Sequence, residues 1–325
     1  MKKSGGLLYL SREDVAAVGP SMAEIIAALE LMFVEKGRGR VEMPPKPGIH
    51  PRPDAFIHAM PAYIPSMNAA GLKWVSGYPR NQARGLPYIH GLIVLNDPGT
   101  GAPVCVMDGT WITAQRTGAA TAVAAKHLAR PDSESAGILA CGVQGRSNLE
   151  ALACSYRLRR VKAYDVRPET AKLFAREMGQ RLNLEIETVS RPEDAVRGLD
   201  LVVTSGPILK KPRPVIEPGW LAPGAFASAV DFDSYWTPAA LRQLDRLATD
   251  DHAQFGYYRK AGYFLKTPAP YADLGEFAAG LKKGRRSHRE RTMSINLGLA
   301  LEDMATAVLV HRRALQRGAG IRLPL

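Results

Sequence analysis

From Pro131 onward, the chain alternates short apolar runs with segments of helical pattern, and no other feature constrains its fold as strongly. Five apolar runs predict strands: 136–140, 161–165, 201–204, 225–230 and 246–249. The two segments that separate the first three runs predict helices at 146–158 and 169–178. Strands that alternate with helices at this spacing pair in parallel, so the pattern predicts an α/β fold with a doubly wound parallel sheet. Right-handed crossovers then place the carboxyl ends of the strands along one edge, where ligands bind.

The first 115 residues follow a different pattern. A helix is expected after Ser11, and four short runs predict strands: 55–60, 71–76, 91–96 and 103–108. The segment Asn96-Asp97-Pro98-Gly99-Thr100-Gly101 between the last two runs is typical of a hairpin turn. This part therefore predicts a mostly antiparallel sheet behind a helix. An Ala-rich helix follows at 117–128, and a helical pattern at 293–313 is expected to cross back to the first domain.

Length and composition narrow the class of protein. The 325 residues, 46% of them hydrophobic and 23% charged, suit about two globular domains. No run of 18 apolar residues predicts a membrane span, and the N-terminus lacks the apolar core of a signal peptide. Three cysteines are too few for a disulfide framework. No Cys-x-x-Cys or His-x-x-x-His pair occurs, so no structural metal site is expected. We therefore expect a reduced, cytoplasmic protein that does not bind a membrane.

The net charge of +12 raises the question of nucleic acid. The densest basic stretch, 282–291, contains no interleaved aromatic residues, which favours a solvated loop over a nucleic-acid surface. A positive field also suits an anionic substrate and cofactor, so no nucleic-acid partner is expected.

A nucleotide turn is indicated between the first two strands of the parallel sheet. Ala140-Cys141-Gly142-Val143-Gln144-Gly145 follows a strand and opens a helix, whose free N–H groups suit a phosphate. Asp165 ends the next strand, 20 positions after Gly145, where an acid accepts the ribose hydroxyl hydrogens of NAD and repels the 2′-phosphate of NADP. Arg167 partly offsets that repulsion, so the prediction is NAD, with NADP possible. The alternative is a domain of this fold that has lost its site.

Several polar side chains interrupt apolar segments, each with two interpretations. Lys73 lies mid-strand, where an outward-facing lysine is the simpler interpretation and an anion partner the functional one. Arg116 lies between the two predicted domains, where its side chain either binds a substrate carboxylate or forms a salt bridge between the domains. Asp231 and Asp233 follow the predicted parallel strand 225–230. The functional interpretation is that one of them serves as a general base, and the simpler one is that it caps the following helix. His58 alternates with apolar neighbours and is more typical of a packed histidine than of a catalyst.

Three stretches, taken together, resemble the ornithine cyclodeaminase/μ-crystallin family over nearly the whole chain. They are Gly71-Leu72-Lys73-Trp74-Val75-Ser76-Gly77-Tyr78-Pro79-Arg80-Asn81, Asp108-Gly109-Thr110-Trp111-Ile112-Thr113-Ala114-Gln115-Arg116-Thr117-Gly118-Ala119, and the Gly142-Val143-Gln144 turn. Leu274-Gly275-Glu276 and Gly298-Leu299-Ala300-Leu301-Glu302-Asp303 add to the likeness. The resemblance implies a homodimer with a substrate-binding and dimerisation domain at 1–117 and 300–325. It also implies a Rossmann NAD(P)-binding domain at 118–299.

Carried over by position, the resemblance implies roles for particular residues. Lys73, Arg116 and Lys46 would meet the substrate carboxylate, with His58 and Tyr235 beside the substrate, and Asp233 would be the catalytic acid. The implied cofactor contacts are Arg116, Thr117, Gly142, Val143, Gln144, Asp165, Arg167, Thr204, Ser205, Val230, Asp231 and Asn296.

Two departures from the family pattern bear on the substrate. Ornithine cyclodeaminase carries a Glu at the position of His58, and a histidine cannot replace that countercharge for the distal ammonium of ornithine. A Pro-Gly-Lys turn is replaced by Ser234-Tyr235-Trp236-Thr237, whose two aromatic residues suggest a pocket for a less polar side chain.

The resemblance thus favours an amino-acid dehydrogenase or imino-acid reductase that transfers a hydride at Cα. The alternatives are an ornithine cyclodeaminase, which returns the hydride and releases ammonia, and a non-catalytic μ-crystallin-like protein that binds dinucleotide and ligand.

Overall fold

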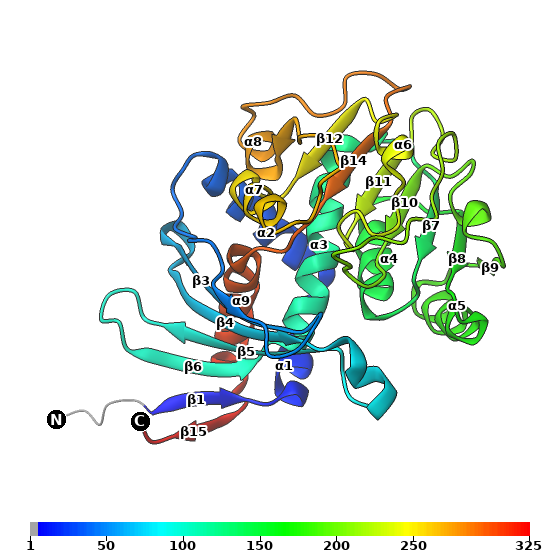
Figure 1. The fold of residues 1–325 in the computed structure, drawn as a ribbon. Coiled ribbons are helices and arrows are strands. Elements are labelled where there is room, and N and C mark those ends of the chain that lie inside the picture. Colours follow the sequence, from blue (N-terminus) through cyan, green and yellow to red (C-terminus); the bar gives the residue numbers. More distant parts are fainter. Residues whose placement is uncertain (1–5) are drawn as a thin grey trace. The chain divides into compact units, whose positions relative to one another are not determined.

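The computed structural model describes residues 6–325, and the chain divides into two compact units (Figure 1). Unit 1 is formed by Met1–Arg116 with Leu299–Leu325, and unit 2 by Thr117–Gly298. The helix α3 (Thr110–Leu128) contains the point of division.

Unit 1 is built on a seven-stranded sheet of order β15-β1-β6-β5-β4-β3-β2. Its pairs are antiparallel except β1 with β6, so the predicted mostly antiparallel sheet is confirmed. The strands are β1 (Leu7–Leu10), β2 (Gly48–Ile49), β3 (Phe56–Ile64), β4 (Ala69–Gly77), β5 (Ile89–Asn96), β6 (Pro103–Asp108) and β15 (Ile321–Leu323). The helices are α1 (Arg12–Val18), α2 (Met22–Gly37) and α9 (Ala300–Arg317), with short 3-10 turns η1 (Pro65–Met67) and η2 (Pro79–Arg84).

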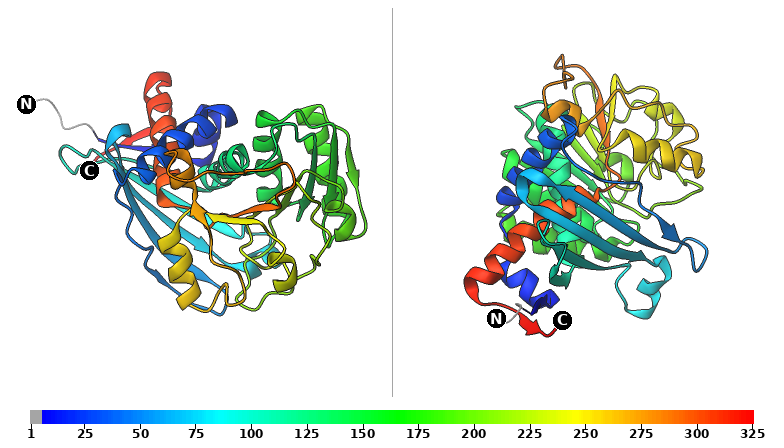
Figure 2. Two further views of the ribbon diagram at one scale, coloured as in Figure 1. Left: turned by 90° about the horizontal axis from the view of Figure 1, so that it is seen from above. Right: turned by 90° about the vertical axis from the view of Figure 1, so that its left-hand side faces the viewer.

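Capping residues explain why the N-terminal helical segment is two helices. The side chains of Ser11 and Ser21 each accept a hydrogen bond from the backbone N–H three residues on, and the carboxylates of Asp14 and Glu24 accept one from the N–H of the cap residue. The second helix packs against α9, which also lies along β3 and β4 (α9 is red in Figure 2). Within residues 6–325, no single helix is long and apolar enough to cross a membrane. The bent pair α1 and α2 passes that test jointly, by length and composition alone.

Unit 2 is built on an eight-stranded sheet of order β13-β12-β14-β11-β10-β7-β8-β9, in which every pair is parallel. The predicted α/β fold with a doubly wound parallel sheet is thereby confirmed. The strands are β7 (Ser135–Leu139), β8 (Arg160–Tyr164), β9 (Ile186–Thr188), β10 (Leu201–Thr204), β11 (Phe226–Ala229), β12 (Arg246–Thr249), β13 (Ala272–Asp273) and β14 (Thr292–Ile295). The helices are α4 (Val143–Ser155), α5 (Pro168–Leu182), α6 (Pro238–Leu241), α7 (His252–Lys260) and α8 (Leu274–Ala278), with a 3-10 turn η3 (Pro192–Ala195).

One predicted element is wrong. The helical pattern expected over 293–313 contains a strand, β14, and the helix α9 begins only at Ala300. β14 pairs with β11 on one side and β12 on the other, and all four of its residues are buried. The strand sequence Thr-Met-Ser-Ile alternates polar and apolar residues, but it is only four residues long, and Met293, Leu297 and Leu301 continue the four-residue spacing of the helix.

The basic stretch 282–291 is not merely a solvated loop. The Arg285 guanidinium donates to the carbonyl oxygens of Leu128, Glu290 and Ala225 and to the hydroxyl of Thr292, at 2.6–3.3 Å. This arginine therefore ties the loop to the strands of unit 2.

Candidate functional site

The side chain of Lys73 lies on the buried face of its strand, where a charged residue is unusual. It lies on β4 in a row with Met60 and Ile93 on the neighbouring strands, and only 1% of its surface is exposed. The next residue, Trp74, is 49% exposed on the opposite face. The simpler interpretation of an outward-facing lysine is therefore wrong, because the charged side chain faces the core and the indole faces out.

The buried Lys73 is paired with acids of the first turn of α9. Its Nζ lies 2.7 Å from Oδ2 of Asp303 and 3.3 Å from the hydroxyl of Thr113. Arg116 joins the same group through Nε, 3.0 Å from Oδ1 of Asp303, and through Nη1, 2.7 Å from Oε2 of Glu302. The interdomain salt bridge considered for Arg116 is not what these contacts form, since all of these residues belong to unit 1. The sequence did not identify Glu302 and Asp303 as partners, although two adjacent acids in an otherwise buried helix were a usable signal.

Burial shifts the pKa values of Lys73 and Glu302 in this cluster. Burial lowers the pKa of Lys73 to about 7, opposed by the nearby Asp303 carboxylate and reinforced by the positive charge of Arg116. Burial also raises the pKa of Glu302, against the attraction of Arg116. The two acids lie in the first turn of α9, where the helix dipole favours negative charge.

Lys46 and His58 belong to the same neighbourhood of unit 1. Lys46 is buried, and His58 is half-buried on β3 with its ring stacked on Phe56 at 4.4 Å between centroids. Burial, followed by the charges of Lys46, His50 and Lys73, lowers the pKa of His58 to about 4. The imidazole is therefore neutral at physiological pH and supplies no charge to a ligand.

The nucleotide turn of unit 2 has the geometry that its sequence predicted. Ala140 takes a left-handed backbone conformation (φ +72°), and Gly142 caps α4 without a side-chain hydrogen bond. A Cβ at Gly145 would lie 2.5 Å from the carbonyl oxygen of Ala140, so only glycine lets strand and helix approach this closely. A Cβ at Gly142 would meet no atom of the described residues within 4 Å, which leaves open space in front of the helix N-terminus. Val143 is exposed and Gln144 partly so at this first turn.

Asp165 braces this turn from the end of β8. Its Oδ2 accepts the N–H of Cys141 and its Oδ1 accepts the N–H of Arg167, both at 2.9 Å. A carboxylate has further lone pairs on each oxygen, so ribose hydroxyls can still donate to it. Open space at Gly142, the N-terminus of α4 and this carboxylate fit a dinucleotide. Arg167 is exposed at the N-cap of α5.

An α3–α4 contact explains the Arg-Thr-Gly-Ala segment. A Cβ at Gly118 would lie 2.3 Å from the carbonyl oxygen of Ser147 in α4, so the glycine permits close packing of the two helices. Thr117, one of the predicted cofactor contacts, is buried beside it.

The ends of β10 and β11 are joined by buried hydrogen bonds. Thr204 donates its hydroxyl to Oδ1 of Asp231 at 2.7 Å, and the N–H of Gly206 lies 3.2 Å from Oδ2. Ser205 donates to the carbonyl oxygen of Ala140, and the N–H of Val230 donates to Thr204. Burial raises the pKa of Asp231 to about 7. Both of its oxygens thus hold the loop after β10.

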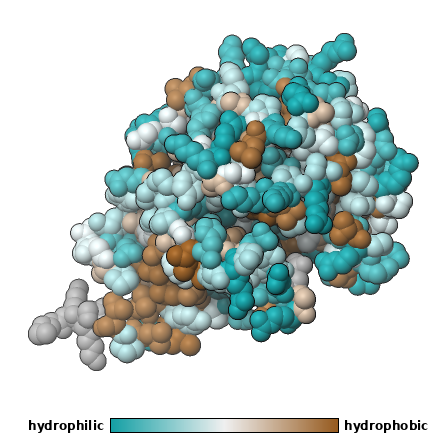
Figure 3. Space-filling model, in the orientation of Figure 1, coloured by the Kyte–Doolittle hydropathy of each residue, from teal (hydrophilic) through white to brown (hydrophobic). Residues whose placement is uncertain are grey.

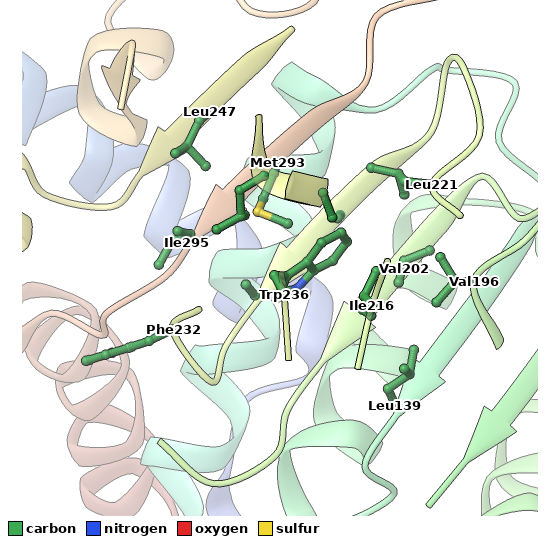
Figure 4. Close-up of a cluster of buried hydrophobic side chains, with 14 of the residues drawn as sticks. Leu139, Val196, Val202, Ile216, Leu221, Phe232, Trp236, Leu247, Met293 and Ile295 are labelled. Atoms are coloured by element: carbon green, nitrogen blue, oxygen red, sulfur yellow. The ribbon is translucent and has the colours of Figure 1, made fainter. Parts of the chain in front are cut away.

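Trp236 belongs to the hydrophobic core and not to a ligand pocket. The indole is 2% exposed, lies beside Ile216 and Met293 in Figure 4, and donates its N–H to the hydroxyl of Thr204 at 3.2 Å. The expectation that Trp236 shapes a pocket is therefore wrong. Tyr235 is only half-buried, with its ring against Gly206, and burial raises the pKa of its hydroxyl.

Asp233 and Asn296 are both buried in unit 2 but differ in their contacts. Oδ2 of Asp233 accepts the hydroxyl of Thr267 at 2.8 Å, and burial raises the pKa of this carboxyl. The Asn296 amide accepts from Ser294 at 2.6 Å and reaches the hydroxyl of Thr121 at 3.5 Å. Asn296 is thus part of a buried polar chain.

The chain resembles several known proteins along nearly its full length. Residues 9–318 match the model of the ornithine cyclodeaminase/mu-crystallin family. The chain is 35% identical to an alanine dehydrogenase of Archaeoglobus fulgidus, over 97% of this chain and 98% of that protein. It is 36% identical to a Δ1-pyrroline-2-carboxylate reductase of Thermococcus litoralis, solved with NADH and L-proline (TM-score 0.89; 98% of this chain and 100% of that one). An archaeal alanine dehydrogenase dimer with bound NAD is 34% identical (TM-score 0.88; 98% and 99%).

Proposed function

Because the chain belongs to the ornithine cyclodeaminase/mu-crystallin family, we propose that it is an NAD(P)-dependent amino-acid dehydrogenase or imino-acid reductase. Gly142, Gln144 and the N-terminus of α4 receive the pyrophosphate, and Asp165 receives the ribose hydroxyls. When bound, the cofactor accepts a hydride from Cα of an amino acid or returns one to the carbon of an imine. The acid at Asp165 favours NAD over NADP.

The observation that carries this proposal is the buried cluster of charged side chains in unit 1. Among its described residues, the buried charged side chains are Lys46, Lys73, Arg116, Glu302 and Asp303. Three of the five are basic, and basic side chains gathered in the core suit the carboxylate of a small substrate. Lys73 and Arg116, held by the two acids, bind that carboxylate through charge-assisted hydrogen bonds and fix the orientation of Cα.

Asp233 acts on the substrate nitrogen. In the oxidative direction its carboxylate removes a proton from the amine, and in the reductive direction its carboxylic acid returns one. The raised pKa of this carboxyl brings it closer to the pH at which both steps must run. The water that adds to the imine in the dehydrogenase reaction is oriented by the same group.

The substrate is an amino or imino acid with one carboxylate and an uncharged side chain. His58 is neutral, so it offers no countercharge to the distal ammonium of ornithine, which disfavours the cyclodeaminase reaction. Alanine, in the name of one relative, and L-proline, bound in the structure of another, each carry one carboxylate and an uncharged side chain.

We further propose a homodimer that forms through the outer face of the unit 1 sheet and works in the cytoplasm. Trp74 and Leu92 lie opposite each other on β4 and β5, and 49% and 46% of their surfaces are exposed. Tyr9 and Ile321 lie opposite each other on β1 and β15 and are exposed as well. Hydrophobic residues, drawn brown, gather at the lower left of Figure 3, where Figure 1 shows β1 and β15. A patch of this kind on a sheet suits a second copy of the chain. The cysteines are free thiols, as in a reducing compartment.

Absorbance at 340 nm tests the proposal. Purified protein is mixed with NADH or NADPH, ammonia and a panel of 2-oxo acids, or with cyclic imino acids alone, and NAD with ornithine is assayed in parallel for ammonia. Oxidation of NADH by pyruvate with ammonia, or by a cyclic imino acid, is the expected result. Ammonia released from ornithine without accumulation of NADH would replace the proposal by a cyclodeaminase. Tight NADH binding without turnover on any substrate would indicate a binding protein.

A further inference from the structure

The Asp233 carboxyl group is held on one side only. Its Oδ2 accepts the Thr267 hydroxyl at 2.8 Å, whereas its Oδ1 is buried and has no hydrogen-bond partner among the described residues. A buried carboxylate oxygen without a donor is costly, so a folded protein retains one where a ligand completes it. The hydroxyl of Thr267 thus determines which of the two oxygens stays available.

Thr267 is itself firmly placed, although it lies in a loop. Its N–H donates to the carbonyl oxygen of Phe264 at 3.2 Å. The Arg259 guanidinium of α7 donates to the carbonyl oxygens of both Thr267 and Pro268 and stacks on the ring of Phe255. Its N–H and its carbonyl oxygen are both hydrogen-bonded and the residue is buried, so the hydroxyl is presented to Asp233 in a defined orientation.

The backbone on both sides of this contact is strained. Phe232, next to Asp233, and Phe264, three residues before Thr267, have φ angles of +64° and +55°. Left-handed conformations are disfavoured for a bulky residue, because its Cβ comes too close to the backbone. The two rings pack against each other with centroids 4.9 Å apart, and Tyr258 and Tyr263 contact Phe232 as well. The aromatic cluster therefore holds both partners in an arrangement that their local sequence disfavours, which is typical of functional sites.

We propose that Thr267 is the positioning residue of Asp233: by donating to Oδ2, it aims Oδ1 at the substrate nitrogen and sets the pH at which the carboxyl gives up its proton. This inference rests on the proposed function of Asp233 as the acid and base of the reaction. Thr267 does not touch the reacting atoms and acts only through the carboxyl group.

The sign of the effect follows from the hydrogen bond. A donor to a carboxylate stabilises its charged form, so the Thr267 hydroxyl lowers the pKa that burial raises. Among the described residues, the charge of Asp233 acts on Asp231 and the Arg259 guanidinium contacts Thr267, while Tyr258 and Tyr263 pack against the neighbouring Phe232. Because they are unchanged by a substitution at Thr267, removal of the hydroxyl raises the pKa of Asp233. The acidic limb of the oxidative reaction and the alkaline limb of the reductive reaction then both move to higher pH.

The test compares Thr267→Val, which keeps the shape and removes the donor, with Thr267→Ser, which keeps the donor. Thr249→Val is the matched control, because Thr249 is also buried and its hydroxyl also lies near an aspartate, Asp250, at 3.3 Å. The pH profile of kcat/KM is measured for each, with the NADH Kd as a check on the cofactor site. The carboxyl carbon of Asp233 is also titrated by NMR in the free protein, with Asp233→Asn used to assign its signal.

We expect Thr267→Val to lower kcat/KM at least tenfold and to shift both the kinetic limb and the NMR titration upward by about one pH unit. Thr267→Ser restores both, and Thr249→Val changes neither. An NMR titration of Asp233 that is the same in Thr267→Val and the unaltered protein overturns the inference, whether or not the protein has turnover. Full activity of Asp233→Asn overturns the proposed role of Asp233 instead, so the two failures are distinguishable.

Discussion

Replacing Asp303 by Asn tests whether the buried ion-pair cluster is held together by charge. The Asp303 carboxylate is entirely buried and contacts Nζ of Lys73 at 2.7 Å and Nε of Arg116 at 3.0 Å. Removing one partner of such a buried group costs about 3–5 kcal/mol. The amide retains an oxygen for Arg116, which also keeps Glu302, so we expect a loss near 3 kcal/mol. That loss corresponds to a fall in Tm of about 6–12 °C.

The stability that Asp303→Asn loses should depend on pH, and the direction of this dependence follows from the pKa of Lys73. Asp303 raises the pKa of Lys73 against burial, so Asp303→Asn lowers it below its value of about 7. Below pH 7 the folded variant must keep an unpaired ammonium or release its proton, whereas the unfolded chain keeps the proton up to a pKa of about 10.4. Above pH 7 Lys73 loses its proton in the unaltered protein as well, so this proton-linked part of the cost disappears and the loss of the charged contact with Arg116 remains. The destabilisation is therefore larger at pH 6 than at pH 8.5.

Urea unfolding of four proteins at these two pH values measures the effect. They are the unaltered protein, Asp303→Asn, Lys73→Met and the double variant, in which no ammonium remains to be paired. The double variant should be more stable than the sum of the single losses allows. Glu169→Gln, which breaks the exposed pair with Lys172, serves as the control and should cost less than about 1 kcal/mol. Additive losses, or an Asp303→Asn cost as small as that of the control, would refute the electrostatic account.

Three further predictions concern the two halves of the site. Gly142→Ala should keep the urea midpoint of the unaltered protein and weaken NADH binding at least tenfold in a fluorescence titration. Gly145→Ala, which forces a Cβ to 2.5 Å from the carbonyl oxygen of Ala140, should also lower the urea midpoint. Equal stability of the two variants would contradict this steric argument. Asp165→Ser should lower the ratio of NADH to NADPH affinity, and an unchanged ratio would remove Asp165 from cofactor selection. His58→Gln should leave the kcat/KM profile between pH 5.5 and 8 unmoved, since the pKa of His58 is about 4; loss of a limb in that window would show that this imidazole titrates during turnover.

Most strands of unit 2 and its helices α4 and α5 could be located from the sequence, but the order of the strands in the sheet could not. Short segments rich in apolar residues locate β7, β8, β10 and β11 to within a residue or two. β7, β10 and β11 are buried along their whole length, which demands a largely apolar strand, whereas β8 alternates buried and more exposed residues. The sequence does not predict the strand β14, which lies between β11 and β12, because its four residues are too few to outweigh the helical spacing of Met293, Leu297 and Leu301. The signal that could have found it is Asn296 with Gly298, whose φ of +80° marks a turn between β14 and α9.

The candidate side chains were predictable by type, and their partners were not. Lys73 and Arg116 are conspicuous in the sequence because charge is rare in apolar segments. Their acids lie far away along the chain, 187 residues from Arg116 in the case of Asp303, and nothing local connects them. Thr267, 34 residues after Asp233, was missed for the same reason. Such contacts depend on how strands and helices pack, which no periodicity encodes.

The residues that break local rules are also the ones to which we assign chemistry. A lysine faces the core of unit 1 while the adjacent tryptophan faces out, although burial energies favour the reverse. In unit 2, Asp233 is buried with one oxygen unpaired, beside a phenylalanine in a left-handed conformation. Each arrangement lowers stability, and each is held in place by partners that serve no other evident purpose: Glu302 and Asp303 in one unit, Thr267 and its aromatic cluster in the other. A chain that needed only to fold could replace the whole ion cluster of unit 1 by packed apolar side chains, and Asp233 by a neutral polar residue, without loss of stability. That both positions keep a charged group, with its supporting residues, is what binding a carboxylate and moving a proton require.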